Sequence, residues 1–129
     1  MKAWFITGAS RGFGALVVER ALAKGDAVVA TARNPQAVID RFGTHANLLA
    51  VALDVTDEAQ AVAAAQAAVD RFGRIDILLN NAGFGLMGAV EEASAAEIEA
   101  LYRTNVFGLL TVTRAVLPHM RARFGRAHV

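Results

Sequence analysis

A glycine-rich segment near the amino terminus constrains the fold of this chain more than any other feature. It reads Thr7-Gly8-Ala9-Ser10-Arg11-Gly12-Phe13-Gly14, and a short apolar run, Ala3–Ile6, comes directly before it. Residues 15–22 then place apolar side chains at helical spacing. A strand, a glycine turn and a helix are typical of a unit that binds dinucleotide phosphates, because glycines let the backbone approach the pyrophosphate and the helix offers unpaired N–H groups. The alternative is a glycine-rich turn without a ligand.

The rest of the chain alternates between apolar runs and helical patterns, each bounded by turn or capping residues. The expected strands are 3–6, 27–32, 48–53 and 75–79, with residues 126–129 as the first part of another strand. The expected helices are 12–24, 35–42, a helix capped by Thr56 and ending at Phe72, and a long helix from a capping box at Ser94 to Phe124. Pro118 is expected to bend the long helix, and the loop 84–93 is expected to be flexible and near a ligand.

Strands that alternate with helices predict an α/β fold, a doubly wound parallel sheet of the Rossmann type with right-handed crossovers. A length of 129 residues suits one domain. We therefore predict a single NAD(P)-binding domain over 1–129, with four strands and the start of a fifth, incomplete at its carboxyl end.

Composition excludes several classes of function. The net charge is +1 and the arginines are scattered, which argues against nucleic acid or a membrane surface as the partner. There is no cysteine and no apolar run near the ~20 residues of a membrane span, so a cytoplasmic location is expected. His45, His119 and His128 share no ligand spacing, so no metal site is predicted.

Four motifs occur in order along the chain, and together they resemble the short-chain dehydrogenase/reductase family. They are Thr7-Gly8-x-x-x-Gly12-x-Gly14, Asp54-Val55, Asn80-Asn81-Ala82-Gly83 and Thr104-Asn105. The resemblance implies hydride transfer between a nicotinamide cofactor and a small carbonyl or alcohol substrate, and a homo-oligomer for a full-length form. The cofactor site is expected to contain Gly8, Ser10, Arg11, Gly12, Phe13, Gly14, Arg33, Asp54, Val55, Asn81, Ala82 and Gly83.

The chain departs from the family in its acid–base residues. Members carry three more strands, a serine and a Tyr-x-x-x-Lys pair beyond this region. Here the one tyrosine, Tyr102, is followed four residues later by Val106, and the lysines are Lys2 and Lys24. The alternatives to an enzyme are therefore a non-catalytic dinucleotide-binding module and an inactive gene fragment.

The end of the second strand bears on the choice of cofactor. Sites that select NAD place a carboxylate there to bind the ribose hydroxyls, whereas an arginine accommodates the 2′-phosphate of NADP. Thr31 and Ala32 occupy that position, and Arg33 follows. With Arg11 in the glycine turn, Arg33 could clamp a phosphate, so the prediction is NADP(H), with NAD(H) the less favoured cofactor.

Three further polar residues have competing interpretations. Asp54 resembles the family aspartate that accepts from the adenine amino group, but it could also be a carboxylate flanking the helix near Thr56. Asn81 is expected to face the cofactor and Asn80 to steady the sheet.

Asn105 falls on an apolar stripe of the long helix. A side-chain amide there needs hydrogen-bond partners or a functional role. The resemblance implies a catalytic part for Asn105, which would hold a water in the proton relay. The alternative is a satisfied core amide. The predicted stripe consists of Ile98, Leu101, Leu109, Val112 and Val116.

Overall fold

The computed structural model describes residues 1–83 and 94–124. Its centre is a parallel sheet in the order β3-β2-β1-β4, which confirms the predicted fold class. The strands are β1 Ala3–Ile6, β2 Ala27–Ala32, β3 Leu48–Ala52 and β4 Ile77–Leu79. The predictions made for the loop 84–93 and for a strand at 126–129 lie outside the described residues.

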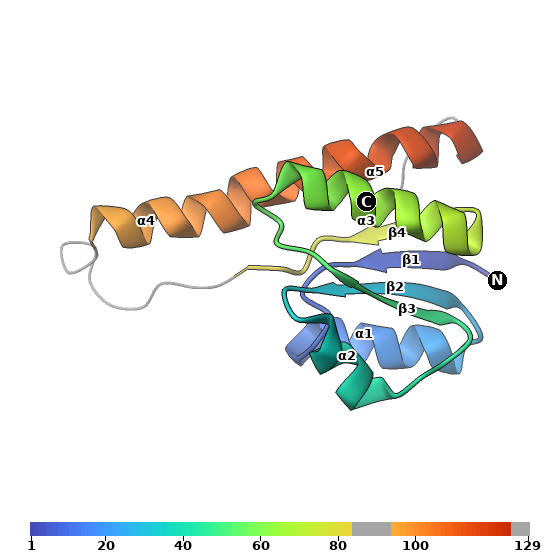
Figure 1. Ribbon diagram of the computed structural model, residues 1–129. Coiled ribbons are helices and arrows are strands. Elements are labelled where there is room, and N and C mark those ends of the chain that lie inside the picture. The colour runs from blue at the N-terminus through green and yellow to red at the C-terminus, as the bar shows by residue number, and fades with distance from the viewer. Residues whose placement is uncertain (84–93, 125–129) are drawn as a thin grey trace.

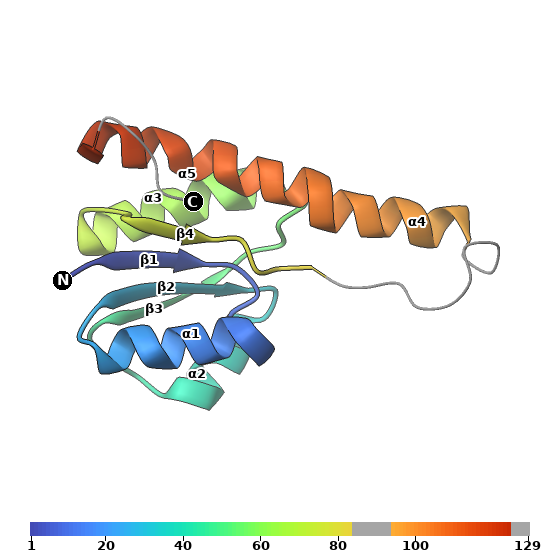
Figure 2. The same cartoon turned by 180° about the vertical axis from the view of Figure 1, so that it is seen from behind.

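Helices cover both faces of the sheet (Figures 1 and 2). Helices α1 (Gly12–Ala23) and α2 (Pro35–Phe42) lie on one face. The other face is covered by α3 (Glu58–Phe72) and α5 (Leu109–Phe124). Between the loop after β4 and α5, the chain forms α4 (Ala95–Tyr102) and a π-helical segment, η2 (Arg103–Gly108), and α4 projects beyond the sheet in both views.

The two layers of helices create two apolar cores because successive strand residues point to opposite faces. Phe5 pairs in register with Val29 and with Leu78, and all three pack against α3 and α5. The next residue, Ile6, packs on the opposite side with residues of α1 and α2. Strands buried on both faces explain why β2 is apolar along its whole length apart from Thr31.

Most helix boundaries follow their sequence signals. Asn34 accepts a hydrogen bond from the backbone N–H of Gln36 and so caps α2, with Pro35 in its first turn. Ser94 and Glu97 form the predicted capping box at the start of α4. Gly25, at φ +87°, ends α1. Helix α5 continues through Pro118 to Phe124.

The predicted cap of α3 is wrong by one residue. Thr56 donates its hydroxyl to Asp54 Oδ1 at 2.7 Å, so it belongs to the turn before the helix. The side chain of Asp57 caps the helix instead by accepting from the N–H of Gln60 at 3.1 Å. Both residue types are good caps, and the contact of Thr56 with Asp54 decided between them.

The predicted apolar stripe of the long helix is also only partly right. Val112 and Val116 are buried, but Leu109 is 41% exposed. The face turned to the core instead contains Thr104, Gly108, Val112, Val116 and Met120. The π-helical segment explains the difference because its i→i+5 hydrogen bonds widen the turn and rotate the following side chains relative to a regular α-helix.

Two buried carboxylates hold the start of β1. Asp76 accepts from the N–H of Ala3 at 2.7 Å and from the guanidinium of Arg74. Asp26 accepts from the N–H of Lys2 and from the indole of Trp4, both at 3.0 Å. The backbone hydrogen bond from Lys2, with further help from Trp4 and Lys24, lowers the pKa of Asp26. These contacts anchor the edge of the sheet opposite the carboxyl ends of the strands.

Within 1–83 and 94–124, no helix has the length and apolar character needed to cross a membrane. The same residues contain no group of three or more side chains suited to binding a metal ion.

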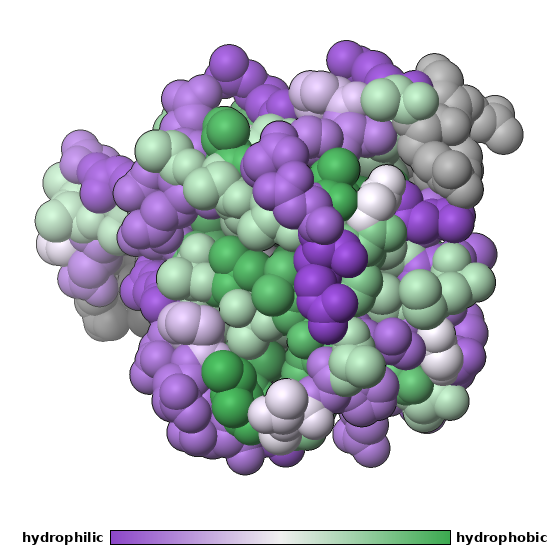
Figure 3. Space-filling model, turned by 45° about the vertical axis from the view of Figure 1, so that its right-hand side comes forward, coloured by the Kyte–Doolittle hydropathy of each residue, from purple (hydrophilic) through white to green (hydrophobic). Residues whose placement is uncertain are grey.

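The purified 129-residue chain is expected to self-associate. In the described part of the chain no strand pairs with the outer edge of β4, and an apolar open edge can pair with another copy. Phe107 and Leu110, 61% and 50% exposed, add unpartnered apolar surface. Figure 3 shows hydrophobic residues also gathered near the middle of one face.

Light scattering over a range of concentrations measures this association. Leu110→Glu should reduce it more than Val62→Glu, a matched change at an exposed position of α3. A monomer with a cooperative melt at all concentrations would contradict the expectation.

Candidate functional site

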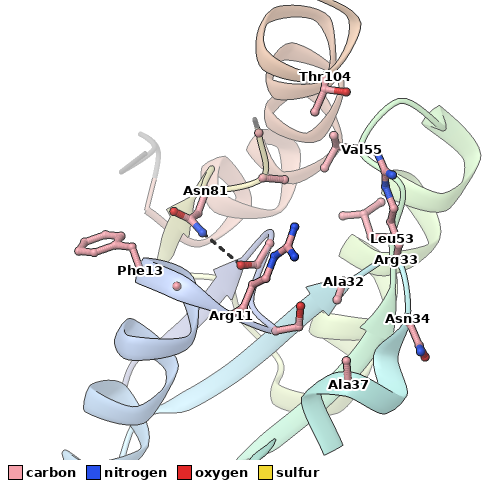
Figure 4. Close-up of a pocket in the computed structure, with 15 residues that line it drawn as sticks. Arg11, Phe13, Ala32, Arg33, Asn34, Ala37, Leu53, Val55, Asn81 and Thr104 are labelled. Carbon is pink, nitrogen blue, oxygen red and sulfur yellow. Dashed lines mark hydrogen bonds between the residues drawn. The ribbon is translucent and has the colours of Figure 1, made fainter. Parts of the chain in front are cut away.

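A cavity of about 850 Å³ opens at the carboxyl ends of the strands (Figure 4). This size falls within the range of small-molecule and cofactor sites. Parallel strands all end at the same edge of the sheet, so the loops that follow them converge there. The lining residues are Gly8, Ser10, Arg11, Gly12, Phe13, Ala32, Arg33, Asn34, Ala37, Leu53, Val55, Asn81, Ala82, Gly83 and Thr104.

The glycine turn after β1 is shaped by close backbone approaches. Gly8 adopts φ +61°, and a Cβ there would lie 3.0 Å from Cα of Ala82. Gly12 adopts φ +62°, a conformation that side chains disfavour. A Cβ on Gly14 would overlap the carbonyl oxygen of Gly8 and lie 2.5 Å from Nδ2 of Asn81. Gly14 therefore lies behind the turn, where it lets α1 pack closely, and does not line the cavity.

The loop after β4 is tied to the glycine turn by Thr7. The buried hydroxyl oxygen of Thr7 accepts from the N–H groups of Asn81 and Ala82, both at 2.9 Å. The Asn81 side chain donates to the Gly8 carbonyl at 3.1 Å (Figure 4). Asn80 turns away and donates to Thr113 of α5 at 3.1 Å, in line with the steadying role expected for it. These bonds hold two walls of the cavity in fixed relation.

Two arginines line the cavity from the segments that follow two different strands. Arg11 comes from the glycine turn and Arg33 from the end of β2, and Figure 4 shows their side chains on two sides of the opening. Within the described residues neither forms an ion pair. The hydroxyl of Thr31 donates to the carbonyl of Ile6 in the neighbouring strand β1 at 3.0 Å, and Thr31 does not line the cavity. Among the described residues, the lining therefore includes two cations and no carboxylate.

Asp54 lies beside the cavity and not in its lining. Its Oδ1 accepts from the hydroxyl and from the backbone N–H of Thr56, at 2.7 and 3.0 Å. These two bonds, assisted by the charge of Arg33, lower the pKa of Asp54. The contacts match the interpretation of Asp54 as a carboxylate that flanks the helix, and its contact with adenine stays a prediction.

Asn105 is half-buried in η2, and its Oδ1 would lie 2.8 Å from a Cβ placed on Gly83. It therefore stands directly behind a lining residue. The neighbouring Thr104, which the sequence marked only as part of a motif, is the residue of η2 that lines the cavity.

Sequence reasoning missed several lining residues because they have no chemical signature of their own. They are Ala32, Asn34, Ala37, Leu53 and Thr104. Ala32, Asn34 and Leu53 end or closely follow β2 and β3, and Ala37 lies in the first turn of α2, so their positions in the chain were the one available signal.

Comparison with known proteins gives the family. Residues 2–127 match the family model described as short chain dehydrogenase. The chain belongs to the short-chain dehydrogenase family. Membership makes it part of a family of oxidoreductases, and it agrees with the glycine turn and with the parallel sheet.

Individual relatives show the same relationship. The chain is 43% identical over 123 residues to "Oxidoreductase BOA17" of Botryotinia fuckeliana, covering 93% of this chain and 44% of that protein. A 3-ketoacyl-(acyl-carrier-protein) reductase from Brucella melitensis, solved with NADH, superposes with a TM-score of 0.89 at 35% identity, covering 97% of this chain and 53% of that one. The NADPH-bound carbonyl reductase from chicken fatty liver gives 0.83 at 31%, covering 92% and 51%. This short-chain dehydrogenase chain spans about half the length of these relatives.

Proposed function

We propose that this chain forms the cofactor-binding half of an NADP(H)-dependent oxidoreductase, which transfers hydride between nicotinamide and a carbonyl or alcohol substrate. The observation that carries the proposal is the cavity itself. It combines a glycine turn with two arginines and lacks a lining carboxylate where NAD-selective sites place one.

The residues present fit a dinucleotide. The Arg11 side chain makes no capping hydrogen bond to α1, so the first N–H groups of that helix and its positive dipole end can receive a phosphate. A side chain on Gly8 would crowd Ala82, so the glycine turn and the loop after β4 are in close contact. Leu53 and Val55 provide an apolar wall suited to the adenine ring.

The chain's own residues are proposed to bind and orient. Arg11 and Arg33 neutralise the 2′-phosphate, and Asn81 with Gly83 borders the ribose on the side of β4. Asn105 is proposed to hold a water of the proton relay, as its family counterpart does. The bound cofactor supplies or accepts the hydride. The proton donor is proposed to come from a serine and a Tyr-x-x-x-Lys pair outside these 129 residues.

The longer form is proposed to be a cytoplasmic homo-oligomer that acts on a small molecule. The alternative is a dinucleotide-binding module without catalysis. Both alternatives require the cavity to bind a dinucleotide.

Arg33→Asp is expected to weaken NADPH binding by about 1.5–3 kcal/mol, the scale of a hydrogen bond to a charged group. NADH binding should change little or improve, because a carboxylate at this position can accept from the ribose hydroxyls. Fluorescence titration of both nucleotides against both proteins measures the difference.

Arg121→Asp serves as the matched control, since it makes the same charge change at an exposed position of α5 away from the cavity. Equal losses for NADPH and NADH in Arg33→Asp would show that Arg33 does not read the phosphate. Failure of the unaltered chain to bind either nucleotide would refute the proposed function.

A further inference from the structure

We infer that Gly108 is a positioning residue for the cofactor cavity and acts through Val55. The expected effect on NADPH binding rests on the proposed function. The claim that Gly108 sets the position of Val55 does not depend on it. Gly108 is the last residue of the π-helical segment η2 and is buried. It does not itself line the cavity.

Space, and not backbone conformation, explains the glycine. Its φ is not positive, so any residue could adopt this backbone. A Cβ on Gly108 would lie 2.7 Å from Cγ2 and 3.3 Å from Cβ of Val55, and 3.2 Å from the carbonyl oxygen of Arg103 one turn earlier in η2. Carbon atoms in van der Waals contact stand about 3.5–4.0 Å apart. Any side chain at position 108 must therefore displace Val55 or move η2 away from it.

Val55 is the residue through which this contact reaches the cavity. It belongs to the loop after β3, is buried and lines the cavity. Thr104, from the other end of η2, lines the same side, and Figure 4 shows Thr104 and Val55 next to each other. The distance between η2 and the β3 loop therefore sets the position of this wall, and the Gly108–Val55 contact sets that distance.

A second close approach holds the same segment from the other side. A Cβ on Gly83 would lie 2.8 Å from Oδ1 of Asn105. The π-helical turn thus fits between the loops after β3 and β4, with a glycine at each contact. Single π turns within α-helices occur frequently at functional sites, and here the turn brings Thr104 to the cavity while Asn105 stands behind Gly83.

The test compares the unaltered chain with Gly108→Ala, Val55→Ala and the double variant, by NADPH fluorescence titration and by ¹⁵N amide spectra without nucleotide. Gly108→Ala should weaken NADPH binding about tenfold, as overpacking of a fitted contact does, and should shift the amide signals of Val55, Thr104 and Gly83. Alanine is a better helix former than glycine, so helix propensity alone predicts a more stable helix and no loss of NADPH binding. In the double variant, removal of Cγ2 should restore the signals and bring the affinity within about twofold of Val55→Ala alone.

Unchanged binding and unchanged spectra in Gly108→Ala would overturn the inference. So would a double variant as impaired as Gly108→Ala, because Val55 would then not carry the effect. If Gly108→Ala does not fold, a folded double variant supports the inference and an unfolded one overturns it. If the unaltered chain does not bind NADPH, the proposed function fails, while the spectra of the four proteins still decide whether Gly108 positions Val55.

Discussion

Gly14→Val is expected to abolish dinucleotide binding. The new Cβ would overlap the carbonyl oxygen of Gly8 and approach Nδ2 of Asn81 to 2.5 Å. Neither group can retreat easily. Gly8 already lies so near the loop after β4 that a Cβ on it would stand 3.0 Å from Ala82, and Asn81 is hydrogen-bonded to both Thr7 and Gly8. The valine must therefore push α1 away from the turn or distort the turn itself.

Either movement removes the arrangement that is proposed to receive the pyrophosphate. NADPH titration by fluorescence measures the loss, and circular dichroism shows whether the variant is folded. Leu16→Val is the matched control because it places the same side chain at an exposed position of the same helix. A folded Gly14→Val protein that keeps its NADPH affinity would refute the assignment of the glycine turn.

The 129-residue chain alone is expected to oxidise no NADPH. Lys2 precedes β1 and Lys24 pairs with Asp26 before β2, so both lysines lie at the sheet edge opposite the cavity. Tyr102 is 55% exposed and does not line the cavity. No tyrosine–lysine pair is therefore available at the cofactor. Loss of general acid–base catalysis lowers a rate by about 10²–10⁴-fold, and poor orientation of the reacting ring lowers it further.

Absorbance of NADPH, followed with a panel of aldehydes, ketones and quinones, checks this expectation on chain free of host reductases. The sensitive control is Asn105→Ala, because Asn105 is the residue proposed for the proton relay. Steady oxidation that scales with the amount of chain and disappears in Asn105→Ala would contradict the prediction. It would mean that catalysis runs through residues within 1–129.

The amino-acid sequence by itself determined the order and type of the elements in the described residues, except for the π-helical segment η2 within the predicted long helix. Alternation of apolar runs with capped helical patterns was enough, because strand burial and helix capping depend on nearby residues. The capping box at Ser94 and the glycine that ends α1 are examples. The carboxyl ends of parallel strands also meet by topology, so most of the cavity could be located from chain order alone.

Tertiary contacts decided the details that depend on distant residues. Thr56 and Asp57 are both residue types that cap helices, and the hydrogen bond from Thr56 to Asp54 leaves Asp57 as the cap. The inward face of the long helix depends on a π-helical turn, and η2 fits there because Gly83 and Gly108 leave room for it against the loops after β4 and β3. Gly14 was predicted to lie where the helix approaches the first strand and the phosphates, and the structure shows which groups exclude a side chain there, Gly8 and Asn81. Spacing along the chain carries no information on such approaches, because they join residues as far apart as Gly8 and Ala82, which meet only after the sheet has formed.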